Sequence, residues 1–343
     1  MNLWFKSGAW ASKKGRQVAA QLAPEDVKSV AVIRHAAVGD MVLTRPFLIE
    51  LRCYFPNAKI TLSLSSNYTR GAPLDLVDCV HEVYGNDRRD VTLKEQITRA
   101  KELGHHDLVF DLAATSRSFW LCLLTSAKLK IGFPYHSLQK YIYYDIAIPR
   151  SDLQFEAENM LGMLNALGHA TQYPPVFDMP VKAAKRDRPY MVYFSSASTK
   201  EKCWPDESFA ELVKQMSERY PKHEHIVLEG IADWESIDDI MSAQNGKENV
   251  VGLRLDDFDE TVSLVKGASL LVGNCTGIRN IALACETPTV GIFFMTPVFR
   301  YWPRYHHHEA AFTPDGKVPS VEQVFGKCRK VVDAVAREKA ISA

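Results

Sequence analysis

Three short stretches of the chain hold residue types that group-transfer chemistry uses. In the first, VIRHAAVGDMVLTRP (32–46), Asp40 lies between a β-branched apolar run and an apolar helical pattern. Ligands bind beyond the carboxyl ends of strands in α/β sheets, so a carboxylate at this junction can take a proton from a hydroxyl group. An acidic residue can equally cap the helix that follows. The residues alone leave both interpretations open.

The second stretch, SSASTKEKCWPDE (195–207), is a predicted loop between a strand and a helix. Lys202 can bind a diphosphate as a point charge, and hydroxyl groups such as that of Ser198 can donate to its oxygens. A lysine in such a loop can also be simply solvated.

The third stretch, LLVGNCTGIRNIALACETPTVGIF (270–293), runs from a strand through Asn-Cys-Thr-Gly into a helix. Free amides and the helix dipole favour a phosphate there. Thr276 could add a hydroxyl group, and Gly277 permits close approach of the ligand. An ordinary strand-to-helix turn has the same composition.

Alternating strands and helices must position these stretches. Short apolar runs predict buried parallel strands, and longer amphipathic runs between them predict helices. The predicted strands are 29–34, 58–65, 80–85, 106–113, 130–134, 190–196, 225–230, 248–253, 268–274 and 288–294. The predicted helices are 41–55, 92–104, 155–168, 205–220, 260–268, 277–285 and 321–340. This alternation predicts an α/β protein with helices on both faces of parallel sheets.

The Pro-rich stretch 171–190 interrupts the alternation and predicts a linker between two domains. The expected parts are a basic segment 1–27, a first domain 28–175, a second domain 188–318 and a closing helix 319–343. The basic segment has no acidic residue before Glu25 and interleaves Trp4, Phe5 and Trp10 with lysines and arginine. Such a pattern suits an anionic membrane surface, and it equally suits a solvated leader helix.

Composition excludes several classes of protein. The 41 basic residues balance 41 acidic residues, which argues against nucleic acid as a partner. Dinucleotide-binding, P-loop and nucleophile-elbow motifs are absent from the sequence. The seven cysteines are widely spaced without a Cys-x-x-Cys pair, so we expect reduced thiols in a cytoplasmic protein and no zinc site. We expect neither a transmembrane helix nor a secretory signal.

Taken together, these stretches resemble the heptosyltransferases of glycosyltransferase family 9. The resemblance rests on VIRHAAVGDMVLTRPFLIELRCYFPNAKI, VFDLAATSRSFW, KIGFP, NMLGMLNALG, KEKCWPDESFAEL and VGNCTGIRNIALACETPTVGIF, in family order over about residues 29–295. It implies a GT-B fold, in which two Rossmann-like domains face a cleft. It also implies an acceptor on the N-terminal side, a nucleotide-sugar on the C-terminal side, and inverting transfer without a metal or other cofactor.

The resemblance also implies roles for individual residues. Asp40 matches the proposed base, and Arg34 and Gly39 fall on the acceptor side. The implied donor-binding residues are Lys202, Ser198, Thr276, Gly277, Glu235, Cys275 and Asn280. Trp204 and Trp234 could stack on the donor, although core packing is the interpretation that we favour.

The sequence departs from the family pattern in three places, one of which is the stretch 294–297, Phe-Met-Thr-Pro, in place of the usual Gly-Pro-Thr-Asp. Cys275 stands where an aspartate is usual, and Asn280 stands where a histidine is usual. A thiol cannot replace a carboxylate that accepts bonds from sugar hydroxyl groups. The family resemblance leads us to expect transfer of heptose from ADP-heptose to the Kdo–lipid A inner core of lipopolysaccharide at the cytoplasmic face of the inner membrane. These departures favour a changed donor pose or a different donor sugar. The alternatives are a member with another donor or acceptor, or a protein that binds nucleotide or glycan without turnover.

Overall fold

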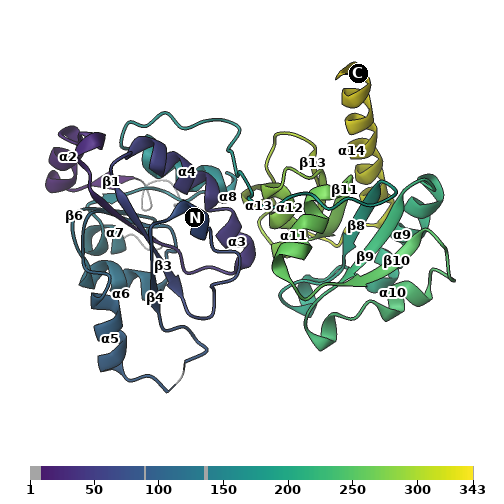
Figure 1. The fold of residues 1–343 in the computed structure, drawn as a ribbon, viewed down its shortest axis with the longest axis horizontal. Helices are drawn as coiled ribbons and strands as arrows, with labels where there is room; N and C mark the ends of the chain where they lie inside the picture. Colours follow the sequence, from purple (N-terminus) through teal and green to yellow (C-terminus); the bar gives the residue numbers. More distant parts are fainter. Residues whose placement is uncertain (1–8, 89, 135–137, 343) are drawn as a thin grey trace. The chain divides into compact units, whose positions relative to one another are not determined.

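The structure, a computed structural model, describes residues 9–88, 90–134 and 138–342. The chain divides into two compact units, Met1–Phe177 and Asp178–Ala343. The division falls inside the Pro-rich stretch 171–190. Each unit is a mainly parallel sheet covered by helices, so the predicted α/β class is confirmed (Figure 1).

The described part of the first unit contains a seven-stranded sheet in the order β1-β7-β6-β5-β2-β3-β4. All neighbouring strands pair in parallel except β1 and β7. The strands are β1 (Trp10–Ala11), β2 (Ser29–Ile33), β3 (Lys59–Ser65), β4 (Cys79–Val83), β5 (His105–Asp111), β6 (Ser126–Gly132) and β7 (Ile146–Ala147). The helices are α2 (Lys13–Ala20), α3 (Val38–Val42), α4 (Arg45–Tyr54), α5 (Leu93–Lys101), α6 (Ser116–Leu124), α7 (Gln139–Tyr143) and α8 (Glu156–Asn165), with short 3₁₀ turns at Pro24–Asp26 and Leu74–Leu76.

The second unit contains a six-stranded parallel sheet in the order β10-β9-β8-β11-β12-β13. Its strands are β8 (Tyr190–Phe194), β9 (Glu224–Glu229), β10 (Val250–Arg254), β11 (Leu270–Asn274), β12 (Thr289–Ile292) and β13 (His308–Ala311). Its helices are α9 (Asp206–Arg219), α10 (Asp238–Ser242), α11 (Phe258–Gly267), α12 (Gly277–Ala284), α13 (Val298–Tyr301) and α14 (Val321–Ser342), with 3₁₀ turns η3 (Lys200–Lys202) and η4 (Asp233–Glu235).

The strand order creates one switch point in each sheet. In the first unit the chain moves from β2 to β3 on one side and later returns to β5 on the other. In the second unit it moves from β8 to β9 and later returns to β11. Loops diverge at such points and leave a crevice beyond the carboxyl ends of the two strands. Strands β8 and β11 are buried along their whole length, as expected for parallel strands covered on both faces.

Some elements differ from the sequence-based prediction. The helix predicted over 41–55 is two helices, because Pro46 in the first turn of α4 has no amide proton to continue α3. Helices α6, α7, α10 and α13 and strand β13 were not predicted. In the basic segment, β1 joins the sheet. Ser12 caps the start of α2, because its hydroxyl oxygen accepts from the amide of Gly15 at 2.8 Å. Trp4, Phe5 and Lys6 lie outside the described residues.

Three further observations concern the chain as described. No described helix has the length and hydropathy needed to cross a bilayer. All seven cysteines are free thiols. Nowhere in residues 9–88, 90–134 and 138–342 do three histidine, cysteine or acidic side chains gather as a metal site.

Candidate active site

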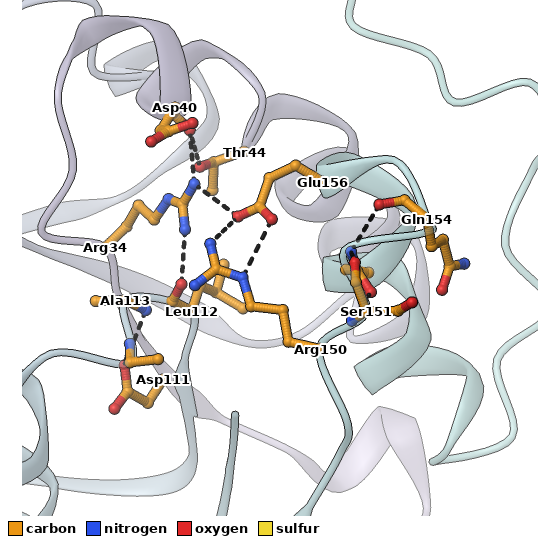
Figure 2. A network of polar contacts seen from close by, with 12 residues as sticks. Arg34, Asp40, Thr44, Asp111, Leu112, Ala113, Arg150, Ser151, Gln154 and Glu156 are labelled. Atoms are coloured by element: carbon orange, nitrogen blue, oxygen red, sulfur yellow. Dashed lines mark hydrogen bonds and ion pairs between the residues drawn. The ribbon is translucent and has the colours of Figure 1, made fainter. Parts of the chain in front are cut away.

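The switch point of the first unit is occupied by Arg34, the residue that follows β2. Its guanidinium is buried and donates to the carbonyl of Leu112, just beyond β5, at 2.6 Å. It also donates to the carbonyl of Asp40 in α3 at 3.0 Å. One side chain therefore connects β2, the end of β5 and helix α3 (Figure 2).

Glu156 balances the charge of Arg34 from the first turn of α8. Its fully buried carboxylate lies 3.2 Å from the guanidinium of Arg34 and also pairs with Arg150 (Figure 2). Two guanidinium groups stabilise the charge of a buried carboxylate, which would otherwise be costly to remove from water. The network therefore sets the position of α3 relative to β2 and α8.

Asp40 lies in the first turn of α3, which begins at Val38, before the start of the predicted helix 41–55. Its carbonyl accepts from Arg34 and from the hydroxyl of Thr44, at 3.0 and 3.2 Å. Its carboxylate oxygen Oδ1 is buried, and no group in the described part of the chain donates to it. The backbone carbonyl of Asp40 is thus held, whereas Oδ1 of its carboxylate is not held by any hydrogen bond from the described residues. Gly39, beside it, is buried.

Two buried side chains near this region have shifted pKa values. His35 directly follows Arg34, and burial together with the nearby Arg117 lowers its pKa to about 3. Asp111, at the end of β5, is fully buried, which raises its pKa. It accepts hydrogen bonds from the hydroxyl groups of Ser118 and Tyr144, each at 2.8 Å. His35 is therefore neutral at ordinary pH, and Asp111 is tied into the packing of α6.

In the second unit, Asn274 lies at the switch point between β8 and β11 and bonds to the loop on the other strand. Its side-chain amide donates to the carbonyl of Ser195, and its side-chain carbonyl accepts from the amide of Trp204 at 3.0 Å. The loop after β8 is thereby fixed to the end of β11. Within that loop, the ammonium group of Lys202 lies 3.3 Å from the hydroxyl oxygen of Ser198.

The loop after β11 brings together the other predicted residues. Thr276 caps α12, because its hydroxyl oxygen accepts from the amide of Ile278 at 3.2 Å. Gly277 begins the helix, and Cys275 precedes the cap with a half-buried side chain. Asn280 is buried, and its side-chain oxygen accepts no hydrogen bond from the described residues.

Arg279 is a functional candidate that the sequence reasoning missed. Its fully buried guanidinium lies 4.8 Å from the centre of the Phe293 ring and donates to the carbonyl of Tyr301. Burial lowers its pKa, with the thiol of Cys275 acting in the opposite direction. The side chain therefore fastens the start of α12 to α13, in the region where the sequence departs from the family pattern.

A pocket of about 480 Å³ lies between the loop after β8 and the segment around η4. Trp234 lines it and is 42% exposed, so the prediction of core packing is wrong for this residue. For Trp204 that prediction is confirmed, since its ring is buried against Phe209. Glu235 follows Trp234 and accepts from the amide of Ala232 at 2.9 Å, which folds its carboxylate onto its own turn.

The sequence reasoning also missed Glu156 and Arg150. Glu156 lies in the first turn of the predicted helix 155–168, where the helix dipole alone is enough to explain an acidic residue. Its pairing with Arg34 spans 122 positions of the chain and leaves no local pattern.

Each unit thus carries a Rossmann-like parallel sheet with polar side chains at its switch point, and paired units of this type define the GT-B class of glycosyltransferases. The Escherichia coli heptosyltransferase WaaC with ADP-2-deoxy-2-fluoro heptose has this fold, with a TM-score of 0.71 at 16% identity over 89% of this chain and 99% of that one. A glycosyl transferase family 9 structure from Veillonella parvula gives a TM-score of 0.69 at 18% identity, over 90% of this chain and 98% of that one. The predicted GT-B fold is confirmed.

The chain belongs to glycosyltransferase family 9, the heptosyltransferases, because the sequence profile of that family matches residues 97–324. It is also 24% identical to lipopolysaccharide heptosyltransferase 3 of Escherichia coli over 281 residues, which cover 75% of this chain and 81% of that protein. The predicted family and the assignment as a glycosyltransferase enzyme are confirmed. The profile match begins after Arg34 and Asp40, and the roles of all the predicted site residues, in both units, remain predictions.

Proposed function

We propose that this enzyme transfers heptose from ADP-heptose to the Kdo–lipid A inner core of lipopolysaccharide, with inversion at the anomeric carbon. The observation that carries the proposal is the carboxylate of Asp40, beside a switch point, with a buried oxygen that accepts no hydrogen bond from the described residues. Family membership supports a heptose donor, and the likeness to a lipopolysaccharide heptosyltransferase supports the acceptor class.

In the proposed reaction, the acceptor hydroxyl oxygen attacks the anomeric carbon as the bond from that carbon to the diphosphate oxygen breaks. Asp40 takes the hydroxyl proton, and ADP leaves with the bonding electron pair. Lys202, with Ser198 beside it, and the amides at the start of α12 stabilise the growing charge on the diphosphate. The mechanism assigns no step to a metal or other cofactor, so EDTA should leave the rate unchanged.

The two units take different substrates in this proposal. The first, including residues 28–175, binds the acceptor with Arg34 and Gly39 near the base. The second, including residues 188–318, binds the nucleotide-sugar, and Glu235 lies beside a pocket that is large enough for part of a nucleotide. Because the acceptor is anchored in a membrane, we place the enzyme in the cytoplasm, at the inner-membrane surface.

The test is a transfer assay with ADP-heptose and Kdo–lipid A, read out by the mass of the product. We expect a gain of one heptose. Asp40→Asn should lower the transfer rate by at least a thousandfold and leave the Kd for ADP within twofold. Retention of most activity by Asp40→Asn would exclude the base role.

A second candidate is transfer of a different sugar. Its support is Cys275 and Asn280, which stand where the family pattern has an acidic residue and a histidine. Asn280 is also buried, and no donor within the described part of the chain reaches its side-chain oxygen. A panel of nucleotide-sugars with the same acceptor tests it. Turnover with another donor and none with ADP-heptose would favour this candidate. Nucleotide binding without any turnover would favour the binding-only alternative.

A further inference from the structure

Two segments of the first unit contain no acidic residue. Residues 1–24 and residues 112–144 have no aspartate or glutamate but eight lysines and arginines. An even spread of the chain's 41 acidic residues over 343 positions would put about seven in these segments. Since the whole chain has no net charge, the asymmetry is local.

The fold brings the described parts of these two segments, residues 9–24, 112–134 and 138–144, together at one side of the sheet. Strand β1 pairs with β7, and α2 packs against β6, while α6 and α7 contact each other (Figure 1). Trp10 in β1 contacts the ring of Tyr141 in α7, with ring centres 4.9 Å apart. Phe119 in α6 stacks on Tyr143 in α7 at 5.1 Å. Helix α7 therefore links α6 to β1, and α2 packs beside them on β1 and β6.

This edge exposes large apolar side chains to solvent. Trp120 and Leu123 lie one turn apart on α6 and are 62% and 45% exposed. Tyr141 and Ile142 in α7, with Leu138 just before it, are each more than half exposed. Exposed apolar side chains gathered in this way mark an interaction surface.

Exposed basic side chains lie on the neighbouring elements. Lys13, Lys14 and Arg16 on α2 are exposed, and so is Lys128 on β6. The nearby carboxylates within the described residues are already paired, Asp145 with Lys14 and Asp107 with Lys128, at 3.1 and 2.8 Å. Basic side chains on elements next to exposed tryptophan, tyrosine and leucine match an anionic lipid surface, where indole and phenol rings lie at the headgroup level.

We propose that this edge, formed by α2, α6 and α7, docks on an anionic phospholipid bilayer. Trp120, Leu123, Tyr141 and Ile142 enter the headgroup region, and the lysines of α2 and β6 contact lipid phosphates. The inference rests on the proposed function in one respect: a membrane-anchored acceptor requires the enzyme to reach a bilayer.

The test is sedimentation of the full chain with vesicles of phosphatidylglycerol and phosphatidylcholine that contain no glycolipid. We expect binding to mixed vesicles, weak binding to pure phosphatidylcholine, and a marked loss of binding at high salt. A double variant, Trp120→Ser with Leu123→Ser, should weaken binding at least tenfold. Lys13→Gln and Lys128→Gln should each weaken it about fivefold and reduce the salt dependence.

Leu93→Ser is the matched control. Leu93 is 72% exposed on α5, a helix of the same unit that carries acidic Glu95 in its first turn. This variant should bind vesicles like the wild type. Because every substituted side chain is exposed, thermal unfolding should be unchanged and will confirm that the variants fold.

Equal binding by the wild type and the Trp120–Leu123 double variant would overturn the proposal. So would a wild-type dimer that the double variant converts to monomers, without any vesicle binding, because the edge would then join two copies of the chain. Vesicle binding is measured without donor or acceptor. If the protein binds vesicles but transfers no sugar, the proposed reaction is therefore rejected and the proposed docking surface still stands.

Discussion

At the scale of single residues, Glu156 is the buried counter-charge of two arginines in the first unit. Its carboxylate is fully buried between Arg34 and Arg150. Glu156→Gln leaves two guanidinium groups without their counter-charge, which should lower the free energy of unfolding by about 3 to 5 kcal/mol. Urea unfolding measures the change. The control Glu102→Gln removes an exposed ion pair with Arg99 and should cost about 1 kcal/mol or less.

The same substitution tests whether the network positions the proposed base. Arg34 holds the carbonyl of Asp40, so disorder of its guanidinium should shift α3. We expect kcat of Glu156→Gln to fall at least tenfold at a temperature where the variant is fully folded, with the Kd for ADP unchanged. An unchanged kcat in the folded variant would restrict Glu156 to a structural role.

His225 makes stability depend on pH. Burial lowers its pKa to about 4, from about 6.5 in the unfolded chain. The unfolded state therefore binds the extra proton first, so this contribution to stability is present above pH 6.5 and is lost as the pH falls towards 4. The loss approaches about 1.4 kcal/mol per pH unit between these values. Thermal unfolding at pH 7.0 to 5.0 should show a shallower decline in His225→Gln, and an identical decline would contradict the assignment.

At the scale of elements, the contact between β12 and α12 depends on a residue without a side chain. A Cβ at Gly291 would lie 2.7 Å from the ring of Phe293 and 3.0 Å from Arg279. Gly291→Ala should therefore destabilise the protein by about 1 to 3 kcal/mol. Gly162→Ala in α8 is the control, since an added Cβ there meets no atom within 4 Å. Its free energy of unfolding, measured with denaturant, should rise by about 0.5 to 1 kcal/mol.

The elements also explain what could be predicted from the sequence. Strands such as β2 and β11 were predicted nearly to the residue, because buried parallel strands are unbroken apolar runs. Strand β13 was not predicted, because it begins at the last of three consecutive histidines and has no apolar run there. His308 is nevertheless buried and hydrogen-bonded to Thr289 at 3.0 Å. Lys202 and Ser198 were predicted in one loop and lie 3.3 Å apart. The partners of Arg34 were not, since contacts between distant residues have no spacing pattern.

At the scale of the whole molecule, the two units should respond differently to nucleotide. If ADP binds the second unit alone, a concentration of one hundred times its Kd adds about 2.7 kcal/mol of stability to that unit. Hydrogen exchange should then slow at the end of β11 and the start of α12 and stay unchanged in β2 and α3. Protection confined to residues before Asp178 would contradict the assignment of the donor to the second unit.

The buried network at Arg34 has a consequence for synthesis on the ribosome. Its partners are separated along the chain by 78 positions for Leu112 and 122 positions for Glu156. A nascent chain that has not yet released α8 from the exit tunnel therefore holds a charged guanidinium without its counter-ion. We expect the first unit to remain accessible to chaperones and proteases until α8 emerges, and translation past that helix to be the event that completes it.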